Sequence, residues 1–574
     1  MMAQEMKIKE GYFDKAKRNH TWSGIPVNEV YRPEDVKGID YSRDMGDPGT
    51  YPFTRGVYSN MYRGRLWSRR LITGCSTPAL TNERFKYLLS EGETAINMIC
   101  DQPTQICLDP DHPMAEGAVG RSGVPICTMN DMFTIMDGIP LDEISAMLTA
   151  ITPIAFPSYL LLAKKTGVPW DKLRGTGGIW PPSLTSPVCM YGGREWHSAF
   201  RSEMEEFVAE TEWVAKNLPL WNPTNYNAYI IRETGVTAAQ EVAFIFAQVF
   251  EVLRTAQECG ADMDLIASKI SFTFSSMIDI FEEVAKFRAA RKIYAKTLKE
   301  TFGIKNPKWL RMKMHVNTGG ILMEFPQATI NIARGAYAGL AAVLGGCQSL
   351  QICGYDEAVA IPTEEAATIA LRTEQILAFE SGVTNVADPL GGSYYVESLT
   401  EKMEEEIQKL IDEIEGMGGL TIAINKGWID QQMEKAWLNY QKEVENKDRV
   451  VVGVNEFTVP DETDRAIPVY HHEVDQELVE RYINEVKELK KNRSRQKVEK
   501  ALDNFRRAAE KGGQNLLPLA MECCKAYVTT GEARGVYRMA KGLPYDPYEM
   551  VEYPFKSKVR PKKRSSKAKA AAAS

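Results

Sequence analysis

Short β-type runs alternate with longer amphipathic helices from about residue 50 to residue 390, and this alternation limits the fold more than any other feature. The helices follow a 3.6-residue apolar period, as in Thr237–Glu258. An unbroken alternation of this length favours a parallel sheet and is long enough for an α/β protein of the (β/α)8 TIM barrel class. An open doubly wound sheet also fits the pattern. We expect strands at Ala95–Cys100, Ser145–Thr149, Asn225–Ile231, Lys269–Phe274, Met312–Asn317 and Ser349–Cys353.

The two ends of the chain differ from this region. Residues 1–50 are polar and rich in Gly, Pro and Asp, which predicts an extended arm. A Ser398…Glu401 capping box predicts a helix over 398–415 that stops at Gly416, and residues 475–512 predict another charged helical stretch. We therefore expect an N-terminal arm (1–50), a barrel (51–397), a helical C-terminal extension (398–555) and a disordered basic tail (556–574).

Composition excludes several classes of function. A net charge of −7 gives no reason to expect binding to nucleic acid, and no apolar run approaches the roughly 18 residues of a membrane span. The first residues contain no apolar signal segment. Ten cysteines without a CxxC pair indicate reduced thiols in a cytoplasm. The six histidines show no HxxxH or HExxH spacing, so we expect no metal site built from this chain alone.

An aromatic and basic segment follows the arm. It runs from Tyr51-Pro-Phe-Thr-Arg-Gly-Val-Tyr58 to Arg65-Leu-Trp-Ser68-Arg69-Arg70, and it places three arginines within six residues. Guanidinium groups bind phosphates bidentately and aromatic rings flank purines, so the segment suits a phosphate-bearing nucleotide. An ordinary surface patch would have the same composition.

Three further blocks lie where loops after barrel strands are expected, and glycines in such loops allow a flat ligand to approach the backbone closely. They are Asp101–Gly123, His315-Val-Asn317-Thr-Gly-Gly320, and Gly345–Leu350 continuing through Asp356-Glu357-Ala-Val-Ala360. In order and spacing, all four blocks resemble the large subunit of the adenosylcobalamin-dependent acyl-CoA mutases, the methylmalonyl-CoA mutase family. The resemblance is clear over residues 50–400 and weaker to about residue 535.

The resemblance implies two groups of binding residues. Lys269 stands where the family usually has arginine, and Glu357 would contact the adenosyl ribose of the cofactor. His315 fits either a core histidine or a hydrogen-bonding partner of substrate or CoA. The positions that match CoA contacts are Tyr58, Met61, Arg65, Ser68, Arg70, Thr149, Thr176, Lys269 and Ser271. The positions that match cofactor contacts are Ser122, Gly320, Glu357 and Ala360.

One family motif is missing. The corrinoid-ligating module carries D-x-H-x-x-G, and no histidine of this chain follows an aspartate at that spacing. The resemblance therefore implies that the cofactor, adenosylcobalamin, has its cobalt ligated by a histidine of a separate small cobalamin-binding subunit, in an α2β2 assembly.

The acyl pocket departs from the family. Ile72 stands where relatives have an aromatic residue, Ile99 where the relative that handles a hydroxylated acyl group has aspartate, and Ile230 where the catalytic segment has histidine. Gly178 and Val188 match polar positions, and a glycine there should open volume. None of these positions offers a partner for a carboxylate, so an apolar acyl group is favoured over methylmalonyl-CoA. Arg194 or His197 could still supply polarity from the altered loop.

These changes leave the catalytic residues open. The candidates are Tyr229, Asn317 and Glu357, and further donors that could replace the lost histidine are Asn227, Arg232 and Trp180. The favoured function is a radical carbon-skeleton mutase of an acyl-CoA. A corrinoid-dependent transferase or lyase and a non-catalytic binding subunit are the alternatives. The retained CoA positions favour the mutase.

Overall fold

The computed structural model describes residues 19–149, 152–179, 200–458 and 473–555. The chain divides into two compact units, each built from segments that are distant in sequence. Unit 1 comprises residues 1–71, 226–253 and 270–472, and unit 2 comprises residues 72–225, 254–269 and 473–574. Among the described residues, no helix has both the length and the apolarity that a membrane span requires. The basic tail predicted at 556–574 lies outside the described residues.

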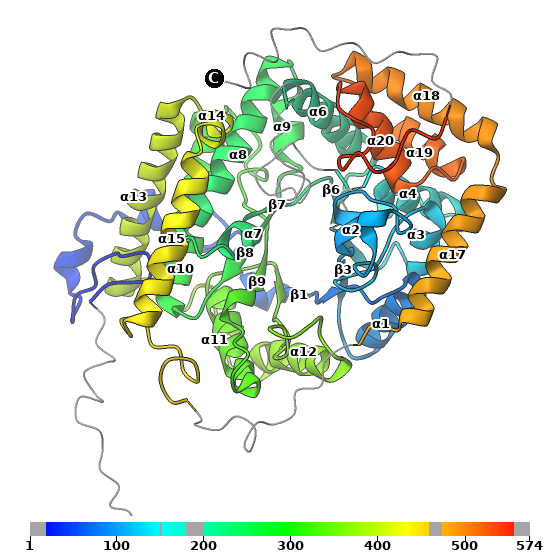
Figure 1. Ribbon diagram of the computed structural model, residues 1–574. Helices are drawn as coiled ribbons and strands as arrows, with labels where there is room; N and C mark the ends of the chain where they lie inside the picture. Colours follow the sequence, from blue (N-terminus) through cyan, green and yellow to red (C-terminus); the bar gives the residue numbers. More distant parts are fainter. Residues whose placement is uncertain (1–18, 150–151, 180–199, 459–472, 556–574) are drawn as a thin grey trace, which may run out of the picture. The chain divides into compact units, whose positions relative to one another are not determined.

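The sheet of unit 1 pairs the first strand of the chain with the last. Its strands are parallel and lie in the order β1-β10-β9-β8-β7. Figure 1 labels β1, β9, β8 and β7. The strands are β1 (Ser68–Arg69), β7 (Tyr226–Asn227), β8 (Phe272–Ser276), β9 (Met314–Thr318) and β10 (Ser349–Gln351). The helices are α7 (Ala228–Arg232), α8 (Ala238–Glu258, its last turn in unit 2), α10 (Ile280–Glu300), α11 (Asn331–Leu344), α12 (Glu364–Phe379), α13 (Tyr394–Met417), α14 (Leu420–Asn425) and α15 (Trp428–Glu445). Short turns are η1 (Pro33–Val36), η2 (Tyr41–Met45), η3 (Met61–Arg63), η6 (Gly320–Leu322) and η7 (Ala328–Ile330).

The sheet of unit 2 is also parallel, in the order β2-β3-β4-β5-β6. Its strands are β2 (Ile72–Thr73), β3 (Ala95–Met98), β4 (Ser145–Leu148), β5 (Arg174–Gly177) and β6 (Trp221–Asn222). Its helices and turns are α1 (Pro78–Ser90), α2 (Gln102–Gln105), η4 (Pro113–Ala115), α3 (Met129–Ile135), α4 (Ala155–Thr166), η5 (Trp170–Lys172), α6 (Phe200–Asn217), α9 (Met263–Ala267), α17 (Gln476–Asn492), α18 (Arg495–Lys511), α19 (Leu517–Lys525) and α20 (Thr530–Ala540).

This strand order is that of a (β/α)8 barrel. Strands consecutive in sequence are neighbours and parallel, and the order lacks the reversal of a doubly wound sheet. Only two residues separate β1 from β2, and three separate β6 from β7. When each of these pairs is taken as one strand, the described residues contain eight strands. The expected fold class, α/β with the parallel strands of a (β/α)8 barrel, is confirmed.

Several predicted strand boundaries are wrong. The strand predicted at Asn225–Ile231 is reduced to Tyr226–Asn227, and the residues after it form helix α7. The β-branched isoleucines favour a strand, but the buried pair is Ala228 and Ile231, and a spacing of three residues belongs to a helix. Strands β5 and β6 are absent from the prediction, because the glycines of β5 hide the strand pattern.

The helices of the C-terminal extension also begin and end differently from the prediction. Helix α13 starts at Tyr394 with Ser393 as its cap, so Ser398 lies inside the helix and is not a capping residue. The helix continues past Gly416, and Gly418 ends it in the left-handed conformation, with a φ of 106°. The stretch 475–512 forms two helices, because Ser494 caps a new helix, α18.

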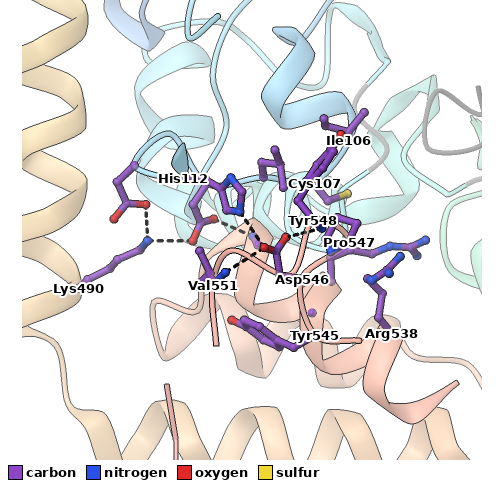
Figure 2. A pocket seen from close by; sticks show the side chains of 16 residues that line it. Ile106, Cys107, His112, Lys490, Arg538, Tyr545, Asp546, Pro547, Tyr548 and Val551 are labelled. Atoms are coloured by element: carbon purple, nitrogen blue, oxygen red, sulfur yellow. Dashed lines mark hydrogen bonds and ion pairs between the residues drawn. The ribbon is translucent and has the colours of Figure 1, made fainter. Parts of the chain in front are cut away.

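The C-terminal helices of unit 2 hold the loop that follows β3 (Figure 2). Lys490 of α17 binds Asp109 at 2.9 Å and Asp111 at 2.6 Å. The Nε2 atom of His112 lies 3.2 Å from a carboxylate oxygen of Asp546. These residues surround a cavity of about 150 Å³. The loop that carries the predicted cofactor position Ser122 is therefore anchored by the extension, and its acidic side chains are used for that purpose.

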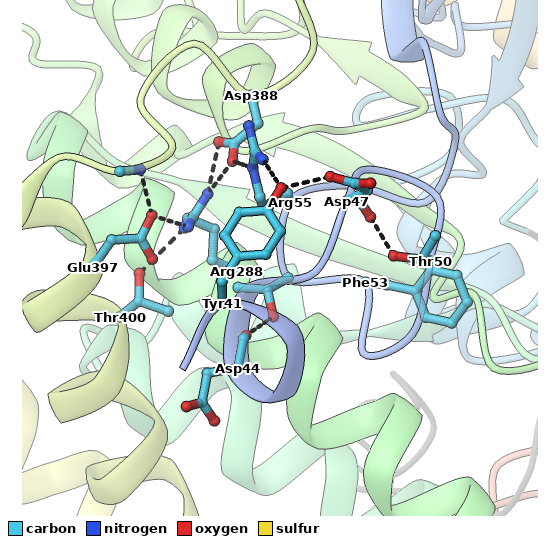
Figure 3. Close-up of polar contacts among 12 residues, drawn as sticks. Tyr41, Asp44, Asp47, Thr50, Phe53, Arg55, Arg288, Asp388, Glu397 and Thr400 are labelled. Carbon is cyan, nitrogen blue, oxygen red and sulfur yellow. Dashed lines mark hydrogen bonds and ion pairs between the residues drawn. The ribbon is translucent and has the colours of Figure 1, made fainter. Parts of the chain in front are cut away.

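A buried ion network ties the N-terminal arm of unit 1 to its helices (Figure 3). Arg288 of α10 donates to both carboxylate oxygens of Asp388 at 2.6 Å and to Glu397 of α13 at 2.5 Å. Arg55 donates to the same aspartate at 2.9 Å and to the hydroxyl of Tyr41 at 3.0 Å. Because Arg288 is fully buried, its charge is stable there only while these carboxylates surround it.

We expect Arg288→Ala to lower the free energy of unfolding by about 3–5 kcal/mol, because it leaves two carboxylates without their shared cation. The free energy of unfolding of Arg288→Lys should lie between those of Arg288→Ala and the parent, since lysine keeps the charge and loses the bidentate fork. Thermal unfolding followed by circular dichroism measures the effect, with the exposed Arg372→Ala as a control that should change little. Equal melting temperatures for Arg288→Ala and the control would contradict the network's role.

Candidate functional site

One face of the unit 1 sheet is polar across its whole width. The face contains one row of residues in register, which are Ser68, Ser349, His315, Thr273 and Asn227. The next row toward the carboxyl ends of the strands contains Gln351, Asn317 and Ser275. The alternate residues form an apolar face of Leu350, Met314, Val316, Phe272 and Phe274. Barrel interiors are usually filled by branched aliphatic residues, so a polar inner face indicates a site for a polar ligand.

Several polar atoms on this face have no hydrogen-bond partner. They are Oδ1 of Asn227, Oγ of Ser275, Nε2 of His315, Oδ1 of Asn317 and Oε1 of Gln351. All five side chains are at most 7% exposed. Each unpartnered buried polar atom costs roughly 1–3 kcal/mol, so a set of them on one face is stable only when a ligand or water supplies the missing partners.

Four of the predicted residues of unit 2 share one face of their own sheet. Ile72 and Thr176 lie in one row, which also contains Asn97 and Met147. The predicted residues Ile99 and Thr149 follow two of these strands at the carboxyl edge. The structure thus brings together Ile72, Ile99, Thr149 and Thr176.

Asn97 is a candidate site residue that the sequence argument missed. It is 1% exposed, and neither its amide nitrogen nor its amide oxygen has a hydrogen-bond partner. It is the direct strand partner of Ile72. The signal in the sequence is a single asparagine inside the apolar run from Ala95 to Cys100.

The expectation that Gly178 opens volume is wrong. A Cβ atom at this position would lie 2.4 Å from Cγ of Phe156, whose ring stacks on Trp221 at 5.3 Å. Gly178 also has a φ of 104°, which side-chain-bearing residues rarely adopt. The ring of Phe156 therefore occupies the space that a side chain at 178 would enter.

The predicted nucleotide-binding segment is half exposed. Tyr58 is 45% exposed, and the guanidinium of Arg311 lies 5.9 Å from its ring centre. Arg65 is exposed, whereas Met61 and Arg70 are buried. Arg311 adds a cation beside the tyrosine, which the sequence argument did not include.

The side chain of Lys269 forms hydrogen bonds with the backbone of its own unit. Its ammonium donates to the carbonyl oxygens of Leu218, Pro219 and Trp221, each at 3.0 Å. Burial lowers the pKa of Lys269 to about 8. The three donors of the ammonium are thus all used. Ser271, two residues further along the chain, is also buried.

A glutamate that was not predicted organises the carboxyl edge of unit 1. Glu233, just after α7, accepts hydrogen bonds from the backbone N–H of Gly320 at 3.1 Å and of Ile321 at 2.8 Å. A Cβ at position 320 would lie 2.9 Å from Glu233 and 3.1 Å from the hydroxyl of Tyr229. The turn needs glycine for this close approach. Ile230 lies on the same short helix, half buried.

Two carboxyl groups at this edge have shifted pKa values. Burial raises the pKa of Glu357 to about 7, and the nearby Asp356 adds to the rise. Burial also raises the pKa of Glu233 to about 7, although the N–H of Ile321 opposes it. The pKa of Tyr229 is raised chiefly by burial, and the carboxylates of Glu233 and Glu357 raise it further. Tyr229, Glu233 and Glu357 are therefore close enough to interact.

The other predicted cofactor positions lie in loops. The backbone N–H of Ala360 donates to the carbonyl of Asp356 at 3.3 Å, within the loop of Glu357. Ser122 is exposed in a unit 2 loop whose Gly120 N–H donates to Asp101 at 2.8 Å. Four predicted positions, Trp180, Val188, Arg194 and His197, lie outside the described residues.

We expect stability to fall as the pH rises from about 4.5 to 7, in part through Glu233. Its pKa is raised from 4.5 to about 7 in the folded chain, so the folded chain keeps a proton that the unfolded chain loses, and this contribution is gone above pH 7. Glu233→Gln cannot titrate, so its melting temperature should fall less than that of the parent between about pH 5 and pH 8. The exposed Glu405→Gln is the control and should follow the parent. Parallel pH profiles for the parent and Glu233→Gln would show that folding does not raise this pKa.

Comparison with known proteins places the chain in a family. The family model described as methylmalonyl-CoA mutase matches residues 20–543. The 2-hydroxyisobutanoyl-CoA mutase large subunit of Aquincola tertiaricarbonis is 39% identical over 522 residues, which are 90% of this chain and 91% of that protein. The methylmalonyl-CoA mutase of Rhizobium meliloti is 35% identical over 91% of this chain and 72% of its own. The mitochondrial methylmalonyl-CoA mutase of Homo sapiens is 32% identical over 89% and 67%. The chain therefore belongs to the methylmalonyl-CoA mutase family.

Proposed function

We propose that this chain is the catalytic large subunit of an adenosylcobalamin-dependent acyl-CoA mutase that rearranges the carbon skeleton of an apolar acyl group. The observation that carries the proposal is the polar face of the unit 1 sheet, with its five unpartnered buried atoms. The pantetheine arm of CoA is an extended chain with two amide groups, and it can supply hydrogen-bond partners along such a face. A methyl-transfer subunit has no use for this arrangement.

We assign the CoA positions by the part of the ligand that each surface suits. Ser68 and Ser271 in unit 1 and Thr149 and Thr176 in unit 2 suit the polar arm, together with the unpredicted Asn97. Tyr58, Arg65 and Arg311 suit the nucleotide, because a guanidinium beside an exposed ring matches a phosphate next to a purine. The donors of Lys269 are already used by the backbone carbonyls of residues 218, 219 and 221. We therefore propose that Lys269 positions this backbone and does not bind CoA directly. The division into arm, barrel (51–397) and extension (398–555) is retained as part of this proposal.

The residues at the carboxyl edge of unit 1 fit the cofactor of the family. Gly320 provides a turn without a side chain, and Tyr229 and Glu357 place polar groups beside it. We propose that Gly320, Ala360 and Ser122 contact the corrin and that Glu357 binds the adenosyl ribose. Adenosylcobalamin supplies the radical chemistry of the rearrangement. The chain's own residues orient the substrate and exclude water.

The cobalt ligand belongs to a partner in this proposal. No D-x-H-x-x-G motif is present in the sequence, and a relative of nearly equal length is named as a large subunit. We propose a small cobalamin-binding subunit in an α2β2 assembly. The nine cysteines among the described residues are free thiols, which suits a cytoplasmic enzyme.

The acyl pocket lacks the partner that a carboxylate needs. Ile72 and Ile99 present apolar side chains on one face of unit 2, and Ile230, which belongs to unit 1, is apolar as well. An unpaired carboxylate in such surroundings costs far more than a few kcal/mol, so methylmalonyl-CoA is a poor substrate here. Asn97 offers an unpartnered amide N–H in the row of Ile72, and we propose that it donates to the thioester carbonyl in place of the missing histidine.

We expect an apolar branched, linear or cyclic acyl-CoA to be isomerised by this chain together with a cognate cobalamin-binding subunit and adenosylcobalamin. Methylmalonyl-CoA should react poorly, and Ile230→His should not rescue it, because the neighbouring positions stay apolar. Chromatography of the CoA esters before and after incubation measures the reaction. If no acyl-CoA binds even at millimolar concentration, the proposed function fails.

We expect Asn97→Leu to lower the activity of the enzyme without lowering its stability. Leucine of similar size removes two unpartnered polar atoms, so the melting temperature should stay equal or rise. Loss of one donor to the carbonyl should lower kcat/KM by about tenfold. Asn217→Leu, at the exposed end of α6, is a matched control that should leave kcat/KM unchanged. Unchanged kcat/KM in Asn97→Leu would show that another group binds the carbonyl.

A further inference from the structure

His315 forms a hydrogen-bonded relay with two serines of neighbouring strands. Its Nδ1 atom lies 2.9 Å from the hydroxyl oxygen of Ser349, and that hydroxyl donates to the carbonyl of Ser68 at 3.2 Å. The three residues stand in register across β9, β10 and β1. All belong to the polar face of unit 1.

The relay determines which ring nitrogen carries the proton. A carbonyl oxygen can only accept, so the single hydroxyl proton of Ser349 points to Ser68. The hydroxyl oxygen must then accept a hydrogen bond from the Nδ1–H group of His315. The opposite tautomer would turn the hydroxyl proton toward Nδ1 and leave two oxygens facing each other at 3.2 Å without a proton between them. Burial, reinforced by the charge of Arg70, lowers the pKa of His315 to about 3, so the ring is neutral.

The other ring nitrogen is then an acceptor without a donor. Nε2 of His315 is buried and has no hydrogen-bond partner, and the residue is only 7% exposed. The side chain of Asn317, two residues further on the same face, lies close enough to the ring to oppose the fall in the pKa of His315, but its amide oxygen completes no hydrogen bond. An amide can be turned to exchange its oxygen and nitrogen, but the ring of His315 is held by the relay. The polar face therefore presents a fixed hydrogen-bond acceptor at the position of His315.

We propose that His315 is a ligand-binding residue whose Nε2 accepts a hydrogen bond from an amide N–H of the pantetheine arm of the substrate. The inference rests on the proposed function, because the N–H groups of that arm belong to its two amides, whereas the thioester has none. The same tautomer excludes His315 as the donor that replaces the histidine lost at position 230. Ser349 acts as the positioning residue, since it holds the tautomer.

The position of His315 agrees with this assignment. The histidine lies two residues before Asn317 on β9. It is therefore about 6–7 Å further from the carboxyl edge of the sheet than Asn317 is. Chemistry in barrels of this class takes place at the carboxyl edge. A contact at this depth reaches the arm of the substrate and not the reacting acyl carbons.

The first test reads the tautomer directly in the full chain without ligand. Nitrogen-15 chemical shifts and long-range proton–nitrogen correlations of the labelled histidines distinguish a protonated Nδ1 from a protonated Nε2, and His315→Gln assigns the signal. We expect Nδ1 to carry the proton in the parent and Ser349→Ala to show a mixture. A proton on Nε2 in the parent overturns the proposal.

The second test measures the hydrogen bond to the ligand. Coenzyme A and two analogues, each with one amide N–H replaced by an ester oxygen, are titrated by calorimetry into the full chain. One analogue should bind the parent about three- to tenfold more weakly than coenzyme A. His315→Phe should bind that analogue and coenzyme A equally, and His315→Gln, which keeps an acceptor, should retain the preference.

The outcomes separate this inference from the proposed function. If coenzyme A binds the parent but both analogues bind equally well, the inference fails and the proposed function stands. If coenzyme A does not bind at millimolar concentration, the proposed function fails, while the tautomer is still decided by the first test. Should His315→Phe not fold, His315→Leu takes its place, because it also removes the acceptor and should also bind the analogue and coenzyme A equally.

Discussion

Polar side chains on the inner face of a buried parallel sheet need hydrogen-bond partners, and much of this structure follows from that need. In unit 1 the rows through His315 and Asn317 are polar, whereas the opposite face of the same strands is apolar and packs under helices such as α10, where Phe274 meets Phe287. A row of valine and isoleucine would make a more stable barrel. The polar row keeps open a surface that an extended polar ligand can complete, and the family assignment gives that ligand a chemical identity.

Stability must then come from elsewhere, and buried ion networks supply part of it. Arg288 joins α10 to α13 through Asp388 and Glu397. Arg55 links Tyr41 of the N-terminal arm to the same aspartate. In unit 2, Lys490 fixes the loop after β3 through two aspartates. These ion pairs hold the N-terminal arm and the loop after β3 in place. The inner faces of the sheets can therefore carry polar residues that bind a ligand and add little to stability.

The retained and altered parts of the site differ in how far they could be predicted. The sequence blocks, read by resemblance, select Ser68, Thr176 and Asn317, and these residues lie on sheet faces because strand residues two apart point the same way. Asn97 and Glu233 were missed, since a lone polar residue in a strand or after a short helix carries no motif. Gly178 was misread, because the ring that fills its space, Phe156, reaches it from helix α4.

Local pattern and residue identity were enough to establish the alternation of strands and helices. By resemblance they also predicted the family blocks and a position, Ile230, where the family has histidine. The folded chain was needed to show which polar atoms lack partners, that the residues around Ile230 form a helix and not a strand, and which nitrogen of His315 carries its proton. Those outcomes depend on contacts between strands far apart in sequence, as in the relay from His315 through Ser349 to Ser68. A hydrogen bond across such a distance is set by the register of the sheet, which no local pattern records.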